Sequence, residues 1–273
     1  MKRGQGMRVL AAALLLVALG ACRREAPAPQ PAARPPQTPA PAAAAAPLSD
    51  VTESTPAYVV GISYPPAVNR YPPLAAELRR YSDAARAELK QAVAGLDGPP
   101  SAPYDLSLSF NLLHDTPRVV SVAADGSSYT GGAHGNPLIA RFTWLPQQQR
   151  MLTAAELVPD PAAWRDISDY AREQLHTALS QRIDSDEGVD PADRADMLRN
   201  AGRMIEEGTE PRAANFAQFE PVLDAQGRIV ALRFVFPPYQ VGPYSDGTQT
   251  VEVPAAVLLP KVAPAYRGLF ATG

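Results

Sequence analysis

The sequence predicts an α+β fold in which helices cover antiparallel β-sheets, and three observations lead to that prediction. Apolar residues recur at helical spacing in two long segments, near residues 72–96 and 160–183, and a helix-start signal at Asp190-Pro191 predicts a third helix through about residue 205. Residues 106–113 alternate between apolar and polar side chains over most of their length, as a half-buried strand does. Strand-like runs at 216–223 and 229–236 flank the turn sequence DAQG, which is typical of a hairpin. Strands joined by hairpins, with helices between them, predict one compact domain of two intimate halves.

The chain begins with features of a bacterial lipoprotein signal peptide, predicted to span residues 1–21. Basic side chains lie near its start, and the apolar segment at 9–19 is too short to span a bilayer as a mature helix. Two small residues then precede Cys22 and resemble a lipobox. We therefore expect cleavage before Cys22 and attachment of lipid, palmitate included, to it. The alternative is an ordinary signal peptide with an incidental cysteine.

Residues 22–50 are predicted to form a lipid-anchored, disordered tether. Residues 26–47 are almost wholly alanine and proline, without the aromatic side chains that build a core. A proline-rich chain of this length reaches on the order of 70 Å at about 3.1 Å per residue. Arg23, rather than aspartate, follows the cysteine, which favours the outer membrane, facing the periplasm, if the organism has two membranes. The predicted location is therefore the cell envelope.

The predicted domain, residues 51–273, must be held together by its core, because Cys22 is the only cysteine and no intrachain disulfide is possible. In the first half, prolines at 65 and 66 end a strand at 58–64, and prolines at 72 and 73 begin the first long helix. Further strands are predicted at 106–113, 119–123 and 138–144. The last two flank a glycine-rich run at 129–137.

The second half is predicted to begin with helices and to end with strands. Thr153 and Glu156 form a capping-box pattern, and Asp160-Pro161 provides an N-cap and a first-turn proline for the second long helix. Asp190-Pro191 repeats that signal for the third. After the hairpin come a last strand at 248–253 and a short helix at 254–258.

Charge excludes one class of partner. The chain has 25 basic and 28 acidic residues, and removal of the signal peptide with Lys2, Arg3 and Arg8 leaves a net charge of −6 with histidine neutral. No basic block appears, so we expect no nucleic-acid partner. A polybasic patch for acidic lipid is also missing, so the attached lipid is the predicted contact with the membrane.

The glycine-rich run is the most distinctive stretch and the first candidate for a binding site. Gly131 and Gly132 indicate a sharp turn or a bulge with positive φ angles, which is the leading interpretation. The alternative is a ligand-binding surface to which Tyr129 contributes its ring and His134 a hydrogen bond.

Tyrosines in a second segment extend this candidate surface. Tyr239 and Tyr244 lie in a loop rich in proline and glycine, where aromatic rings stack on sugars or contact proteins. With Tyr129 and Trp144 they define a possible aromatic face. The other interpretation is that these rings are ordinary core and hairpin residues.

Catalytic machinery is not evident, so no catalytic residue, metal or cofactor is predicted. The three histidines, His114, His134 and His176, lie in different predicted elements, and no nucleophile-elbow pattern surrounds Ser127 or Ser128. The acidic segment at 184–188 lacks the ligand spacing of an EF-hand. The glycine-rich run also lacks the ending of a phosphate-binding loop.

Three sequence runs resemble the extracellular domain family shared by the anti-sigma factor RsiV and the non-catalytic part of the deacetylase PdaC. They are ISYP at 62–65, SSYTGGAH at 127–134, and FVFPPY at 234–239 with the later glycines and VEVP at 251–254. The resemblance covers residues 58–259 and implies a domain outside the cytoplasm, usually tethered to a membrane.

In RsiV this domain is a receptor for lysozyme, and in PdaC it accompanies a separate deacetylase domain. The present sequence has neither a cytoplasmic sigma-binding segment nor the Asp-Asp pair of a deacetylase, and no second histidine follows His176 at metal-ligand spacing. The resemblance implies a non-catalytic binding module for a lysozyme-like protein or peptidoglycan. The alternative is an envelope hydrolase or polysaccharide deacetylase of an unrecognised type.

Overall fold

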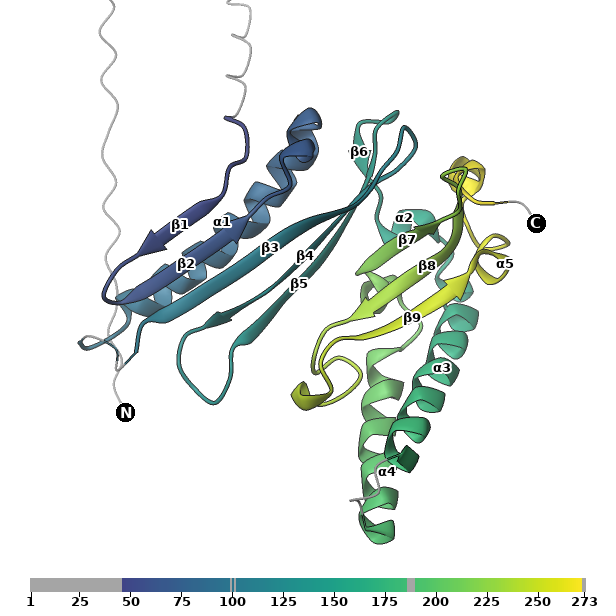
Figure 1. Ribbon diagram of the computed structural model, residues 1–273. Helices are drawn as coiled ribbons and strands as arrows, with labels where there is room; N and C mark the ends of the chain where they lie inside the picture. The colour runs from purple at the N-terminus through teal and green to yellow at the C-terminus, as the bar shows by residue number, and fades with distance from the viewer. Residues whose placement is uncertain (1–45, 99, 101, 186–189, 272–273) are drawn as a thin grey trace, which may run out of the picture. The chain divides into compact units, whose positions relative to one another are not determined.

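The computed structural model of the chain describes residues 46–98, 100, 102–185 and 190–271 (Figure 1). The predicted signal peptide, the lipidation at Cys22 and almost all of the tether lie outside the described residues. Most of the acidic segment at 184–188 also lies outside them. The described residues all belong to one compact unit.

The first half is built on one mixed sheet, sheet A. Six strands of the described chain form it in the order of the sequence. Neighbours are antiparallel except β2 and β3, which are parallel because helix α1 connects them as a crossover. The strands are β1 (Val51–Ser54), β2 (Tyr58–Ser63), β3 (Tyr104–Asp115), β4 (Val120–Tyr129), β5 (Asn136–Leu145) and β6 (Arg150–Met151).

Helix α1 (Pro72–Ala94) covers one face of sheet A. Its apolar side chains recur every three to four residues, and Leu74, Leu78 and Leu89 are fully buried against the inward-facing side chains of β3. Glu53 on β1 ties the helix to the sheet by accepting from Arg86 and pairing with Lys90 at 3.3 Å. The hydrogen bond from Arg86 holds the pKa of the Glu53 carboxyl below its usual value.

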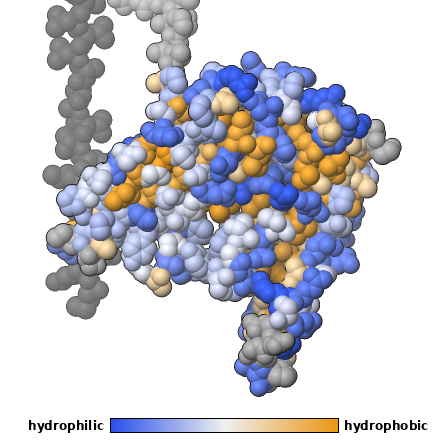
Figure 2. All heavy atoms as spheres, in the orientation of Figure 1, coloured by the Kyte–Doolittle hydropathy of each residue, from blue (hydrophilic) through white to orange (hydrophobic). Residues whose placement is uncertain are grey.

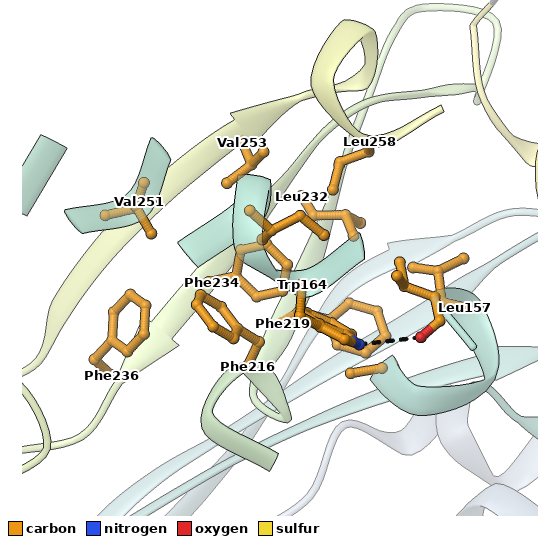
Figure 3. Packing of buried hydrophobic residues seen from close by; sticks show 14 of the residues in the cluster. Leu157, Trp164, Phe216, Phe219, Leu232, Phe234, Phe236, Val251, Val253 and Leu258 are labelled. Carbon is orange, nitrogen blue, oxygen red and sulfur yellow. Dashed lines mark hydrogen bonds between the residues drawn. The ribbon is translucent and has the colours of Figure 1, made fainter. Parts of the chain in front are cut away.

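The second half packs helices against a smaller antiparallel sheet, sheet B, with the strand order β7-β8-β9. The rings of Trp164, Phe216 and Phe234 form the centre of its core, with centroid distances of 5.4 Å and 5.1 Å along that series (Figure 3). The elements of this half are α2 (Ala154–Leu157), α3 (Trp164–Ser185), α4 (Pro191–Gly208), β7 (Phe219–Leu223), β8 (Ile229–Phe236), β9 (Gln249–Pro254) and α5 (Ala255–Leu258). Short 3-10 turns lie at Pro66–Arg70 in the first half and at Pro161–Ala163, Ala213–Phe216, Tyr244–Asp246 and Pro264–Leu269 in the second.

The distribution of polar residues on the surface matches this division into sheets and helices. In Figure 2, apolar residues gather over the two sheets, and mainly polar residues cover the projecting ends of α3 and α4. Among the described residues, no helix is both long and apolar enough to cross a bilayer.

An ion-pair network joins the halves where β5 lies beside β7. The side chain of Arg141 on β5 is only 7% exposed, and its Nε donates to Glu220 on β7 at 2.5 Å. Its Nη1 pairs with Asp125 on β4 at 2.9 Å. Arg233 on β8 also contacts Glu220, at 3.3 Å, and its hydrogen bond to Glu252 raises the pKa of the guanidinium.

The sequence-based elements are confirmed with four corrections. Strand β4 continues to Tyr129 instead of ending near residue 123. Gly126 does not end the strand, because it lets β4 and β3 approach each other closely at that point. A Cβ atom there would lie 2.0 Å from the Ser107 carbonyl oxygen of β3. Strands β1 and β6 were not predicted, since both are very short. Phe216 lies in a 3-10 turn that precedes the strand, and β2 pairs with β3 in parallel.

Candidate ligand-binding site

The glycine-rich run forms the loop that closes the β4–β5 hairpin. Gly131 and Gly132 have φ angles of 97° and 99°, so the turn with positive φ angles is confirmed. A Cβ atom on Gly132 would meet nothing within 4 Å, so glycine is needed there for its backbone conformation and not for space. The Tyr129 hydroxyl donates to the Gly132 carbonyl at 3.1 Å and braces the loop. Tyr129 also packs edge-to-face against Tyr104, with centroids 6.5 Å apart.

His134, at the exposed side of this loop, contacts the β8–β9 connection of the other half. The two loops lie at the same end of the domain (Figure 1). The His134 imidazole stacks on the Tyr244 ring with a centroid distance of 3.9 Å and an interplanar angle of 11°. Its Nε2 lies 2.7 Å from the Tyr239 hydroxyl. These three rings form the aromatic cluster.

The hydrogen bonds around the imidazole define its tautomer. Nδ1 of His134 lies 3.2 Å from the Gly135 carbonyl oxygen, which can only accept. Nδ1 therefore carries the proton of the neutral ring, and Nε2 accepts from the Tyr239 hydroxyl.

Tyr239 is 53% exposed and has a φ angle of 74°, which non-glycine residues rarely adopt. Two anchors hold this conformation. The Tyr239 amide donates to the Gly242 carbonyl at 3.0 Å. The Gln240 side-chain amide donates to the carbonyls of Gly208 at 3.0 Å and Asn215 at 2.8 Å.

Gly208, the last residue of α4, lets the loop reach that position. A Cβ atom on Gly208 would lie 2.0 Å from the Gln240 carbonyl oxygen. Neither Gly208 nor Gln240 was predicted from the sequence to belong to the site. Gly208 followed by Thr209 resembles an ordinary helix end, and the partner of Gln240 is 32 residues away.

The structure thus brings together most of the predicted aromatic face. His134, Tyr239 and Tyr244 are in mutual contact, and Tyr129 stands at the base of the same loop. Trp144 does not belong to this face, because it is 3% exposed and lies in the core beneath α1. The contacts of these residues are defined by the geometry, whereas their roles in binding remain predictions.

The other histidines lie apart from this cluster. His176 on α3 faces Glu206 on α4, with Nε2 and Oε1 3.2 Å apart. His114 is near the far end of β3. Within the ranges that the structure describes, no three histidine, cysteine, aspartate or glutamate residues are grouped so that they would hold a metal ion.

Two family models match separate segments of the chain. Residues 51–137 match the family model described as "Deacetylase PdaC", and residues 157–256 match "Protein of unknown function (DUF3298)". The first match covers β1 to the start of β5, and the second covers α3, α4 and sheet B. No curated protein matches the chain.

A solved structure of the second family resembles this chain in fold over most of its length. A DUF3298 family protein from Pseudomonas aeruginosa PAO1 is 17% identical, with a TM-score of 0.53 over 82% of this chain and 94% of that chain. A family member from Bacteroides fragilis NCTC 9343 is 15% identical, with a TM-score of 0.44 over 81% and 94%. At such low identity the first likeness shows the fold alone. With both family matches, it shows that the chain carries a PdaC/RsiV-like domain, in which a PdaC segment is followed by a DUF3298 segment.

Proposed function

We propose that the chain is a cell-envelope lipoprotein whose PdaC/RsiV-like domain binds an envelope ligand through the aromatic cluster, without catalysis. One observation carries the proposal: Tyr239 is exposed and yet held at a positive φ by contacts from two directions. Such strain costs on the order of 1–3 kcal/mol and persists only where the surrounding structure enforces it. Holding a ring ready for a ligand accounts for this conformation.

The chemistry of the cluster suits a lysozyme-like protein or peptidoglycan as the ligand. A rigid tyrosine ring provides an apolar face for a sugar or for the cleft of a protein, and its hydroxyl provides a polar tip. The neighbouring imidazole of His134 orients that hydroxyl at 2.7 Å.

The binding proposal predicts that Tyr239→Ala weakens capture of the ligand at least tenfold. An exposed aromatic anchor at the centre of an interface contributes about 1.4 kcal/mol or more, which corresponds to that factor. The measurement is titration of the full chain with lysozyme and, separately, with soluble peptidoglycan fragments. His134→Ala should weaken the same interaction, while the melting temperature stays within a few degrees because the ring is exposed.

Leu113→Ala provides the matched control. Leu113 is an exposed apolar side chain, 38% accessible, at the opposite end of β3 from the candidate loop, so its removal should leave both titrations unchanged. Failure of the wild type to bind either ligand would contradict the proposal. Release of acetate or reducing sugar from peptidoglycan would instead support the hydrolase or deacetylase alternative.

The envelope location rests on the lipobox at Cys22 and on the domain family. We expect the mature wild-type protein to fractionate with membranes and to incorporate labelled palmitate. Cys22→Ser should move it to the soluble fraction or leave it unprocessed, because no thiol remains to be acylated. A wild-type protein that is soluble and retains residues 1–21 would refute the lipid anchor while leaving the binding proposal intact.

A further inference from the structure

A cleft of about 280 Å³ opens between α3, α4 and the 3-10 turn Tyr244–Asp246. It is separate from the exposed ring of Tyr239, although the turn borders both. Its walls are mostly apolar side chains, namely Leu179 and Ile183 of α3 and Met197, Ala201 and Met204 of α4. The cleft therefore offers an apolar ligand a place to lie between two helices and a loop.

The size of the cleft limits what fits. A water molecule takes about 30 Å³ in the liquid, so the space corresponds to about nine waters or a similar number of non-hydrogen ligand atoms. A second hollow of about 20 Å³, which Leu175 and Ile205 also line, shares Leu179 and Ala201 with the cleft. A slender, unbranched chain fits between two helices better than a fused ring system does.

Polar groups gather at the mouth of the cleft. Arg182 reaches across from α3 and donates through Nη2 to Asp246 at 2.6 Å. A guanidinium has five N–H groups, and Asp246 is its one acceptor within the described residues, so further donors remain for a ligand. The Asn200 side chain accepts from Arg203 at 2.9 Å, which leaves its NH₂ group as another donor. Since Asp246 is already paired, the mouth favours a ligand with an acceptor-rich, anionic head.

The methionine side chains in the wall of the cleft would adapt to a flexible apolar chain. Met197 is 45% exposed, although it lies on the side of α4 that borders the cleft. Methionine has three rotatable bonds and a polarizable sulfur, so it adapts to a chain that slides between helices. A ligand in the cleft would cover this exposed side chain.

From these observations we infer that the cleft is a second binding site, which takes a small amphipathic carboxylate with an unbranched chain of about eight carbons. The chain lies between Leu179 and Met204, and the carboxylate accepts from Arg182. The turn at the mouth also carries Tyr244, which stacks on His134. Occupancy of the cleft should therefore be visible at the imidazole of His134.

The test is titration of the purified full chain with butanoate, hexanoate and octanoate. Calorimetry measures the binding, and the NMR signals of His134 report the occupancy of the cleft. Each added CH₂ should tighten binding about fourfold as it is buried. Octan-1-ol, which has the same chain but no charge, should bind at least tenfold more weakly. The His134 signals should shift in proportion to occupancy.

Variants show whether the ligand lies in the cleft. Ala201→Leu should fill the space and weaken octanoate binding at least tenfold, and Arg182→Gln should remove the preference for octanoate over octan-1-ol. Leu198→Ala is the matched control, because this half-exposed side chain of α4 does not line the cleft.

Four results would overturn the inference: no saturable octanoate binding, no dependence on chain length, equal binding of octan-1-ol, or unchanged binding by Ala201→Leu. Tighter binding of N-acetylleucinamide than of octanoate would also overturn it, since the cleft would then receive a side chain of a protein partner. The chain-length and octan-1-ol comparisons use the wild type, so they decide the question even if a variant fails to fold.

Discussion

Arg141→Met is expected to destabilise the domain by about 3 kcal/mol, which is typical of breaking a buried ion pair by removal of one partner. Glu220 is 8% exposed and accepts from the Arg141 Nε at 2.5 Å. Without Arg141, the remaining ion-pair partner of Glu220 among the described residues is Arg233, which lies 3.3 Å away and is 41% exposed. The methionine also cannot donate to the carbonyls of Ala124 and Ala140, which Arg141 Nη1 contacts at 3.1 Å and 3.0 Å.

The measurement is thermal and denaturant unfolding of the full chain at neutral pH. A loss of about 3 kcal/mol lowers the melting temperature of a domain this large by about 6–12 °C. Arg233→Met is the matched control, because the Arg233 side chain is 41% exposed and its loss should cost about 1 kcal/mol or less.

A double variant separates the ion pair from general packing. Arg141→Met with Glu220→Leu replaces both charges with apolar groups, and it should recover most of the stability that the single change removes. A single Arg141→Met protein as stable as the wild type would show that the two halves do not depend on this network.

Gly208→Ala is expected to cost about 2 kcal/mol and to loosen the loop that carries Tyr239. Neither partner in the resulting clash with the Gln240 carbonyl can move freely. The end of α4 is fixed because the buried Ser168 hydroxyl donates to the Thr209 carbonyl. The loop is fixed by the Gln240 amide. Overpacking of this kind typically costs 1–3 kcal/mol, which exceeds the gain in helix propensity of about 0.5–1 kcal/mol.

Gly202→Ala, in the same helix, provides the control. Its added Cβ would meet only the ring of His176, with Cε1 at 3.3 Å and Nδ1 at 4.0 Å, and that side chain is 41% exposed and can turn away. This variant should equal or exceed the wild type in stability. Melting curves and the ligand titration should separate the two alanine variants, and equal behaviour would show that the loop tolerates displacement.

Local signals in the sequence were sufficient for most helices and hairpins. The capping box of Thr153 and Glu156 is present with both of its hydrogen bonds, and Asp160 caps the Ala162 amide at 2.9 Å. Such signals operate within three or four residues, so a single sequence contains all the information that they need.

Long-range geometry explains what the sequence did not predict. Gly126 interrupts the pattern of an apparent strand. The need for glycine there is visible only in the structure, because a Cβ atom would lie 2.0 Å from the Ser107 carbonyl oxygen of β3. The partners Arg141 and Glu220 are 79 residues apart, so no periodicity connects them. The candidate residues around Gly131 and Tyr239 were found through composition, whereas their contact through His134 depends on how the halves pack.

The aromatic cluster also has a consequence for how such domains are inherited. His134 belongs to the segment that matches PdaC, and Tyr239 and Tyr244 belong to the segment that matches DUF3298. The cluster exists only when both segments are present and correctly docked. Any selection on this contact would therefore act on the pair as one heritable unit. A chimera that joins a PdaC segment to a DUF3298 segment from another lineage would have to rebuild this contact to restore the cluster.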